Sequence, residues 1–123
     1  MISRSELNPH GYTLTPDQAR NFELLYVAMN AVRCAYGKPM YVNSGVRSVE
    51  DQRRINPAHM QDAHVHAAGC DIDAQDGYLW DWCIDHLDLI TRLGLYLESR
   101  VYTPRHIHFQ IIPPKSGNRI FIP

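Results

Sequence analysis

Two short clusters of histidine and aspartate stand out as residues that could do chemistry. The first is the segment His66-Ala-Ala-Gly-Cys-Asp-Ile-Asp73, and the second is His106-Ile-His108. Zinc in hydrolytic enzymes is commonly held by three groups drawn from histidine and carboxylate, which leaves a fourth position for water. Two histidines and one aspartate from these clusters would meet that requirement. The pattern therefore indicates a zinc site.

The spacing within each cluster suits a shared site on a sheet. His106 and His108 lie two apart in a predicted strand, so both side chains project from one face. Asp71 and Asp73 share a face of another predicted strand for the same reason. If the strands pair, imidazoles and carboxylates converge, and buried ionisable groups are costly unless paired or bound to a metal. The alternative from spacing alone is a set of surface or hydrogen-bonded core histidines.

The composition excludes several classes of protein. The chain has 123 residues, of which 45% are hydrophobic and 20% charged. A chain of this length and composition can bury a hydrophobic core without disulfides or other cross-links to stabilise it. A formal net charge of -1 lacks the basic footprint of a nucleic-acid binder. Three cysteines without CxxC spacing argue against disulfides and against a thiolate zinc site. We expect a single domain over residues 1–123 that acts as a monomer and binds no nucleic acid.

Capping signals and periodicity predict the elements that must position the clusters. Thr15-Pro16-Asp17-Gln18 begins a long helix that Gly37 ends. The order of helices and strands favours an α+β fold, with a central antiparallel sheet and helices packed on one side. The further elements expected are a strand over 40–43, a helix from Ser48 to about Ile55, a loop over 56–65, a strand over 69–75, one helix ending near Gly94, an ambiguous segment over 95–102, and strands over 105–112 and 119–122.

The pattern His66-x-x-Gly69-x-x-x-Asp73, preceded by Ser44-Gly-Val-Arg-Ser48 and followed by His106-x-His108, resembles the M15-type zinc peptidases. That superfamily includes D-Ala-D-Ala metallopeptidases, murein endopeptidases and the Hedgehog signalling domain, and several bacteriophage endolysins are similar. The resemblance runs from about Tyr41 to Ile111. It implies a Hedgehog/DD-peptidase-like fold and a Zn²⁺ cofactor.

The resemblance also implies three zinc ligands: His66, Asp73 and His108. A second register, His64 with Asp71, has the same spacing, but it would place Ala67 where the family has glycine. We therefore expect Gly69 to fix the register on His66. Asp71 is then expected to orient a liganding imidazole or to hydrogen-bond the nucleophilic water, and His64 to line the cleft or contact substrate.

The remaining site residues follow from the same resemblance. Arg47 matches a family arginine that holds a substrate carboxylate or carbonyl oxygen, a role that suits the paired donors of a guanidinium; the alternative is a salt bridge anchoring the turn. Ser44 shapes that turn or contacts substrate. Some branches carry a glutamate as general base three residues before the last zinc histidine, where this chain has Arg105. His106, which titrates near neutrality, is the expected substitute.

The leading hypothesis is a zinc metallopeptidase that hydrolyses peptidoglycan stem peptides or cross-links with metal-activated water. The alternative is a non-catalytic peptidoglycan- or metal-binding module on the same fold, which the missing glutamate favours. A structural virion component is a third possibility. The N-terminus lacks the apolar run of a signal peptide, and no stretch reaches the length of a membrane span. We expect cytoplasmic synthesis and action on the cell wall after release or from a phage particle.

Overall fold

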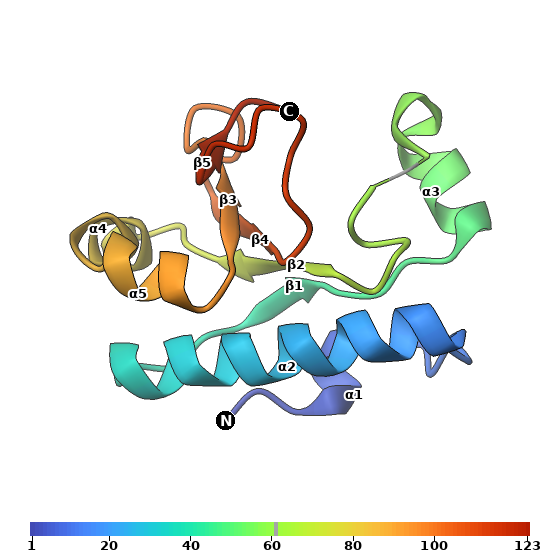
Figure 1. The fold of residues 1–123 in the computed structure, drawn as a ribbon, viewed down its shortest axis with the longest axis horizontal. Helices are drawn as coiled ribbons and strands as arrows, with labels where there is room; N and C mark the ends of the chain where they lie inside the picture. Colours follow the sequence, from blue (N-terminus) through green and yellow to red (C-terminus); the bar gives the residue numbers. More distant parts are fainter. Residues whose placement is uncertain (61) are drawn as a thin grey trace.

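The computed structural model describes residues 1–60 and 62–123, and its centre is an open five-stranded sheet with the strand order β1-β2-β4-β3-β5 (Figure 1). Neighbouring strands are antiparallel except β3 and β5, which are parallel. The expected α+β class is confirmed. The elements are α1 (Arg4–Leu7), α2 (Pro16–Tyr36), β1 (Val42–Ser44), α3 (Val49–Ile55), the 3-10 turn η1 (Pro57–His59), β2 (Gly69–Asp73), α4 (Tyr78–Asp85), α5 (Leu87–Arg92), β3 (Tyr96–Glu98), β4 (His106–Gln110) and β5 (Ile120–Phe121).

Helix α2 forms as its capping signals predict. The Gln18 backbone N–H donates to Thr15 Oγ1 at 3.2 Å, and the Gln18 side-chain oxygen accepts from the Thr15 N–H at 2.9 Å. Gly37 ends the helix in the left-handed conformation, with φ 75°. The helix lies along the sheet (Figure 1) and buries its apolar side chains in the core. It therefore supports one face of the sheet and leaves the other for the site.

The two central strands divide their side chains between these faces. Cys70 and Ile72 of β2, with Ile107 and Phe109 of β4, have no exposed surface and join the α2 side chains in the hydrophobic core. The residues that alternate with them, the aspartates and histidines singled out in the sequence, project from the opposite face. The alternation therefore gives the sheet one polar face, which carries these aspartates and histidines, and one apolar face, which packs into the core.

Two local features differ from the expected elements. The single helix expected before Gly94 is two helices, α4 and α5, because His86 leaves the helical conformation with φ −118° and ψ 33°. The His86 ring nitrogen Nδ1 lies 2.8 Å from the Trp82 carbonyl oxygen and satisfies that group at the break. The first residues also form a helix, α1, which opens on a capping box between Ser3 and Glu6. That pairing was visible in the sequence as Ser-x-x-Glu.

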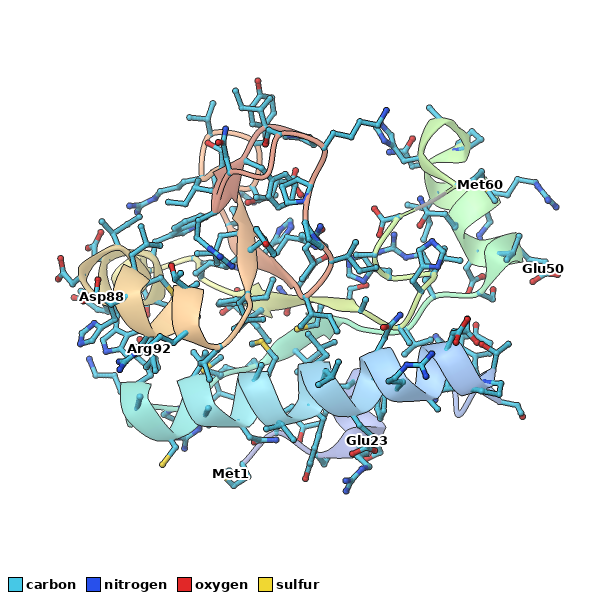
Figure 2. All side chains as sticks on the ribbon, in the orientation of Figure 1. Met1, Glu23, Glu50, Met60, Asp88 and Arg92 are labelled. Carbon is cyan, nitrogen blue, oxygen red and sulfur yellow. The ribbon has the colours of Figure 1, made fainter. Side chains whose placement is uncertain are left out.

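Helix α1 ties the N-terminus to the rest of the fold. Arg4 forms an ion pair of 2.9 Å with Glu23, which projects from the side of α2 away from the sheet (Figure 2). Leu7 is fully buried, and its carbonyl oxygen accepts a hydrogen bond from the Val46 N–H at 2.8 Å. None of the described helices has the length and apolar content needed to cross a membrane.

Candidate metal centre

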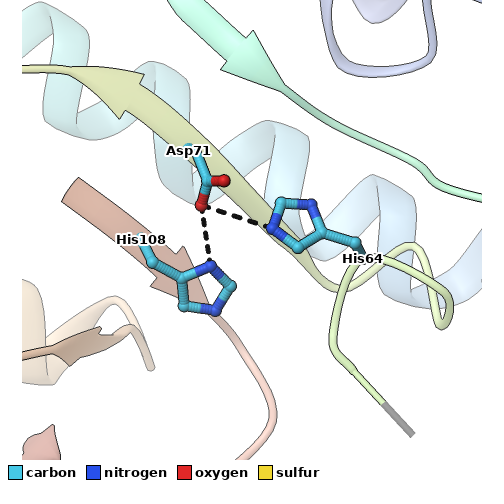
Figure 3. Close-up of side chains that lie close together, drawn as sticks. All are labelled: His64, Asp71 and His108. Carbon is cyan, nitrogen blue, oxygen red and sulfur yellow. Dashed lines mark hydrogen bonds and ion pairs between the residues drawn. The ribbon is translucent and has the colours of Figure 1, made fainter. Parts of the chain in front are cut away.

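Three side chains converge on the polar face of the sheet: His64, Asp71 and His108. Their ligand atoms lie within 4.8 Å of one another, with Asp71 between the two imidazoles (Figure 3). Asp71 Oδ1 is 3.3 Å from His64 Nε2 and 2.9 Å from His108 Nδ1. Both histidines are buried and the aspartate is partly buried. This is the donor set of two nitrogens and one carboxylate oxygen that a catalytic zinc site uses.

Strand register brings Asp71 to His108. In the antiparallel pairing of β2 with β4, Asp71 lies opposite His108 and Asp73 lies opposite His106. Side chains directly opposite on one face are the closest cross-strand neighbours. His108 therefore meets the first aspartate of the Asp-x-Asp run and not the second, which the sequence did not reveal because it does not state the register.

His64 reaches the cluster from the loop that precedes β2. Its ring nitrogen Nδ1 lies 2.8 Å from the Gly45 carbonyl oxygen, and its backbone carbonyl accepts the Arg47 N–H at 3.1 Å. Its own backbone N–H donates to Asp62 Oδ1 at 2.9 Å. These contacts hold the ring on two sides and direct Nε2 toward Asp71.

Ala67, in the loop between His64 and β2, has an unusual backbone conformation. It has φ 56° and is the one non-glycine residue in the described chain with a positive φ, the region that favours glycine. The second register places Ala67 at the family glycine, and Ala67 has a backbone conformation that glycine adopts most readily. Gly69 instead lies in β2, where an added Cβ would come within 2.9 Å of Ala63 Cβ and 3.1 Å of His108 Cε1. Gly69 is needed for close packing and does not mark the register.

The expected ligand set is therefore not the set that the structure brings together. Of His66, Asp73 and His108, only His108 belongs to the cluster. His66 lines a cavity next to it, and Asp73 lies opposite His106. Asp71 and His64, expected to support the site or contact substrate, occupy the ligand positions of the second register.

The hydrogen bonds around the cluster leave a place for a cation. Gly45 O can only accept, so His64 Nδ1 carries a proton and the Nε2 lone pair faces Asp71. His108 Nε2 lies 2.7 Å from Gln110 Oε1, while the Gln110 amide group donates to the Ile112 carbonyl oxygen. The His108 Nδ1 lone pair then also faces Asp71. Three acceptors this close repel one another unless a proton or a metal ion lies between them, so the residues present fit zinc.

Charge in the metal-free site supports the same reading. Burial by itself would raise the pKa of Asp71, but hydrogen bonds from His108 and His64 hold it well below its ordinary value. Burial would likewise lower the pKa of His108, yet the neighbouring Asp71 keeps it above its ordinary value. A proton shared between His108 and Asp71 would therefore compete with a metal ion for the same place, and metal binding would release it.

The other expected residues lie around this cluster. His106 is partly exposed on the same face, with Nε2 3.9 Å from Asp71 Oδ2. Arg47 donates to Gln52 Oε1 at 2.7 Å and to Ser44 Oγ at 3.0 Å, both neutral partners. The salt-bridge alternative for Arg47 thus has no support in these contacts. Ser44 contacts Arg47 and helps to hold the guanidinium.

Glu98 is a candidate site residue that the sequence analysis missed. The pairing of β3 with β4 sets Tyr96 opposite Gln110 and Leu97 opposite Phe109, and one further step sets Glu98 opposite His108. Burial raises the pKa of Glu98, and the positive charges of His108 and His106 oppose that rise. A carboxylate therefore lies on the strand next to the cluster. Alternation from buried Leu95 and Leu97 was the available signal, but that segment was ambiguous in the sequence.

Comparison with known proteins identifies the family. The chain matches the family model described as Peptidase M15 over residues 3–84, more than half of its 123 residues. The chain belongs to the Peptidase M15 family. The expected resemblance is confirmed, and family membership together with the candidate metal site supports a peptidase. The match includes His64 and Asp71 but ends before His108, which strand pairing brings to Asp71. No curated protein and no solved structure matches the chain.

Proposed function

We propose that the protein is a zinc-dependent peptidase in which His64 Nε2, Asp71 Oδ1 and His108 Nδ1 hold the metal. The observation that carries this proposal is the convergence of two imidazole lone pairs on one carboxylate oxygen, with each ring's other nitrogen bonded to a neutral acceptor. Such outer hydrogen bonds fix the tautomer and orientation of metal-binding histidines. When bound, zinc would activate water and polarise the scissile carbonyl.

The chain's own groups would then handle the protons and the developing charge. Peptide hydrolysis adds water to the carbonyl carbon, breaks the C–N bond and delivers a proton to the leaving amine. His106 is one candidate proton acceptor on this face, in the role expected from the sequence. Glu98 is a second, and it offers the carboxylate that Arg105 replaces at the family position. The Arg47 guanidinium, held by neutral partners, would donate to the substrate carbonyl oxygen or carboxylate.

The substrate proposed is a peptidoglycan stem peptide or cross-link, since the M15 resemblance implies cell-wall peptides that contain D-amino acids. The protein would then act on the wall after release from the cell or from a phage particle. A second candidate is a non-catalytic peptidoglycan- or metal-binding module. Arg105 at the expected glutamate position is the observation that favours it.

The experiment combines metal analysis with a digest of defined muropeptides. The purified protein should hold about one zinc per chain, as expected for a site with three protein ligands, and should release peptide fragments. His64→Asn should lose both zinc and activity, whereas the exposed His10→Asn is the matched control that keeps both. Full activity of a chelated, metal-free sample would contradict the proposal. Zinc and peptide binding without turnover would support the binding module.

Glu98→Gln and His106→Gln separate the two proton acceptors. Each variant should keep zinc, because neither side chain belongs to the cluster of three. The variant that removes the true acceptor should lower kcat by about a hundredfold or more, the usual contribution of a general base. It should also remove the corresponding limb of the pH–rate profile.

A further inference from the structure

A groove runs beside the candidate metal centre, along the N-terminal half of α2. One cavity of about 570 Å³ is lined by Arg20 and Asn21 of α2, by Ala63 and His66, and by Gln110. A second hollow of about 420 Å³ shares Asn21 and His66 with the first. The two hollows therefore adjoin each other at His66, and we refer to them together as the groove.

The groove opens next to the metal-binding side chains. Gln110, which lines the larger cavity, also accepts the hydrogen bond from His108 Nε2 at 2.7 Å. Ala63, on the same wall, directly precedes His64 in the chain and packs against Gly69 of β2. A molecule in the larger cavity would thus lie beside two of the three candidate ligands.

Helix α2 holds His66 in this position. Asn21 Nδ2 donates to the His66 carbonyl oxygen at 3.1 Å, and Gln18 Nε2 donates to the Val65 carbonyl oxygen at 2.9 Å. Both bonds act on the backbone, so they fix where the loop presents the partly buried imidazole. Side chains held by a rigid helix contribute more to recognition than those on free loops.

The lining suits a peptide. Asp17 and Arg20 form an ion pair, so the groove has balanced charge and does not select a polyanion. Ile112 and Pro113 add apolar surface to the lining of the larger cavity. A lining that combines apolar surface with hydrogen-bonding groups such as Asn21 and Gln110 suits a peptide, which offers both kinds of group. The larger cavity alone is within the range of about 300–1,000 Å³ typical of small-molecule sites, so the whole groove has room for more than a short fragment.

We propose that His66 is a substrate-binding residue at the middle of this groove, which holds an extended peptide segment next to the bond that is cut. The inference rests on the proposed function and refines it, because it makes the enzyme selective for longer peptides over dipeptides. It also gives His66 and His64 opposite tasks: the imidazole expected to bind zinc contacts substrate, and the one expected to contact substrate binds zinc.

The test uses a series of peptidoglycan stem peptides of two to five residues, with His66→Ala and His66→Asn compared with wild type and His10→Ala. Both His66 variants should retain full zinc content. The value of kcat/KM should fall about tenfold for the pentapeptide, the worth of one good hydrogen bond or contact, and much less for the dipeptide. The longest peptide should also bind the metal-free His66 variants about tenfold more weakly by calorimetry.

The calorimetric measurement separates this inference from the proposed function. In one outcome, the wild-type protein hydrolyses none of the peptides while the metal-free His66 variants bind the longest peptide more weakly than metal-free wild type. That combined result would uphold the groove and refute the proposed peptidase activity. Loss of zinc in His66→Asn would overturn the inference, because His66 would then be a ligand. An equal loss of kcat/KM at every peptide length, or unchanged binding by the metal-free variants, would overturn it as well.

Discussion

Replacing Ala67 with glycine tests the loop conformation that directs His64 to the metal centre. Ala67 is fully buried and has φ 56°, whereas its neighbour Ala68 is equally buried and is not among the described residues with positive φ. The two alanines are therefore a matched pair that differ in backbone conformation. A glycine relieves steric strain at Ala67 and relieves none at Ala68.

The expected effects follow from three contributions to the free energy of unfolding. Replacing an alanine in the left-handed region with glycine removes a steric cost of about 1–2 kcal/mol and so raises the free energy of unfolding by that amount. Against this, the extra freedom of glycine in the unfolded chain costs about 0.4–1 kcal/mol, and the loss of one buried methyl group costs about 0.8 kcal/mol. Ala67→Gly should thus be neutral to within about 1 kcal/mol. Ala68→Gly, which carries only the two losses, should be destabilised by about 1.2–1.8 kcal/mol.

Urea denaturation of the chelated, metal-free proteins measures both changes without a contribution from bound metal. The gap between the two variants should be about 1–2 kcal/mol, which is the strain itself. Equal destabilisation of Ala67→Gly and Ala68→Gly would refute the reasoning, because it would mean that Ala67 carries no left-handed strain. The glycine-like position in the loop, and with it the preference for His64, would then lose its physical basis.

Three further predictions concern the groups around the candidate metal centre. Gly45→Ala would place a Cβ about 2.0 Å from the Leu7 carbonyl oxygen, so the Gly45 carbonyl that holds the His64 ring must move; zinc affinity, measured against a competing chelator, should fall about ten- to a hundredfold. Because Asp71 keeps the His108 pKa above its ordinary value, the stability that this pair gives the metal-free protein should be complete below about pH 6.5 and be lost as pH rises through the raised pKa. Asp71→Asn should abolish that dependence in pH-resolved denaturation. Gln52→Leu removes the acceptor that holds Arg47, together with the amide group that donates to the Asn56 and His59 carbonyl oxygens. It should lower kcat/KM about ten- to a hundredfold with zinc content unchanged.

The elements that depend on local signals could be predicted from the sequence. Thr15, Gln18 and Gly37 define α2 through contacts within a few residues, and Ser48 caps α3 in the same way. The strand alternation that sets His106 and His108 on one face is equally local. These features need no knowledge of which segments meet in space.

The three side chains that converge at the candidate metal centre could not be predicted, because their convergence depends on two features that the sequence does not show. The first is the register of β2 against β4, which places Asp71, and not Asp73, directly opposite His108. The second is the positive φ of Ala67, which cannot be recognised from the residue type. Gly69 pointed to the other register, but the structure needs a glycine there because a Cβ would clash with Ala63. In a sequence, a glycine needed for space cannot be told from one needed for its backbone conformation.

The strand order determines when the candidate metal centre can be completed during synthesis of the chain. β2 pairs with β4, although two helices and a strand lie between them in the chain. A nascent chain that has left the ribosome as far as β3 already contains His64 and Asp71, but the third ligand has not yet been added. Two groups hold zinc far less well than three. In the proposed zinc peptidase, metal binding and peptide hydrolysis would therefore both wait until β4 has been synthesised and has paired with β2.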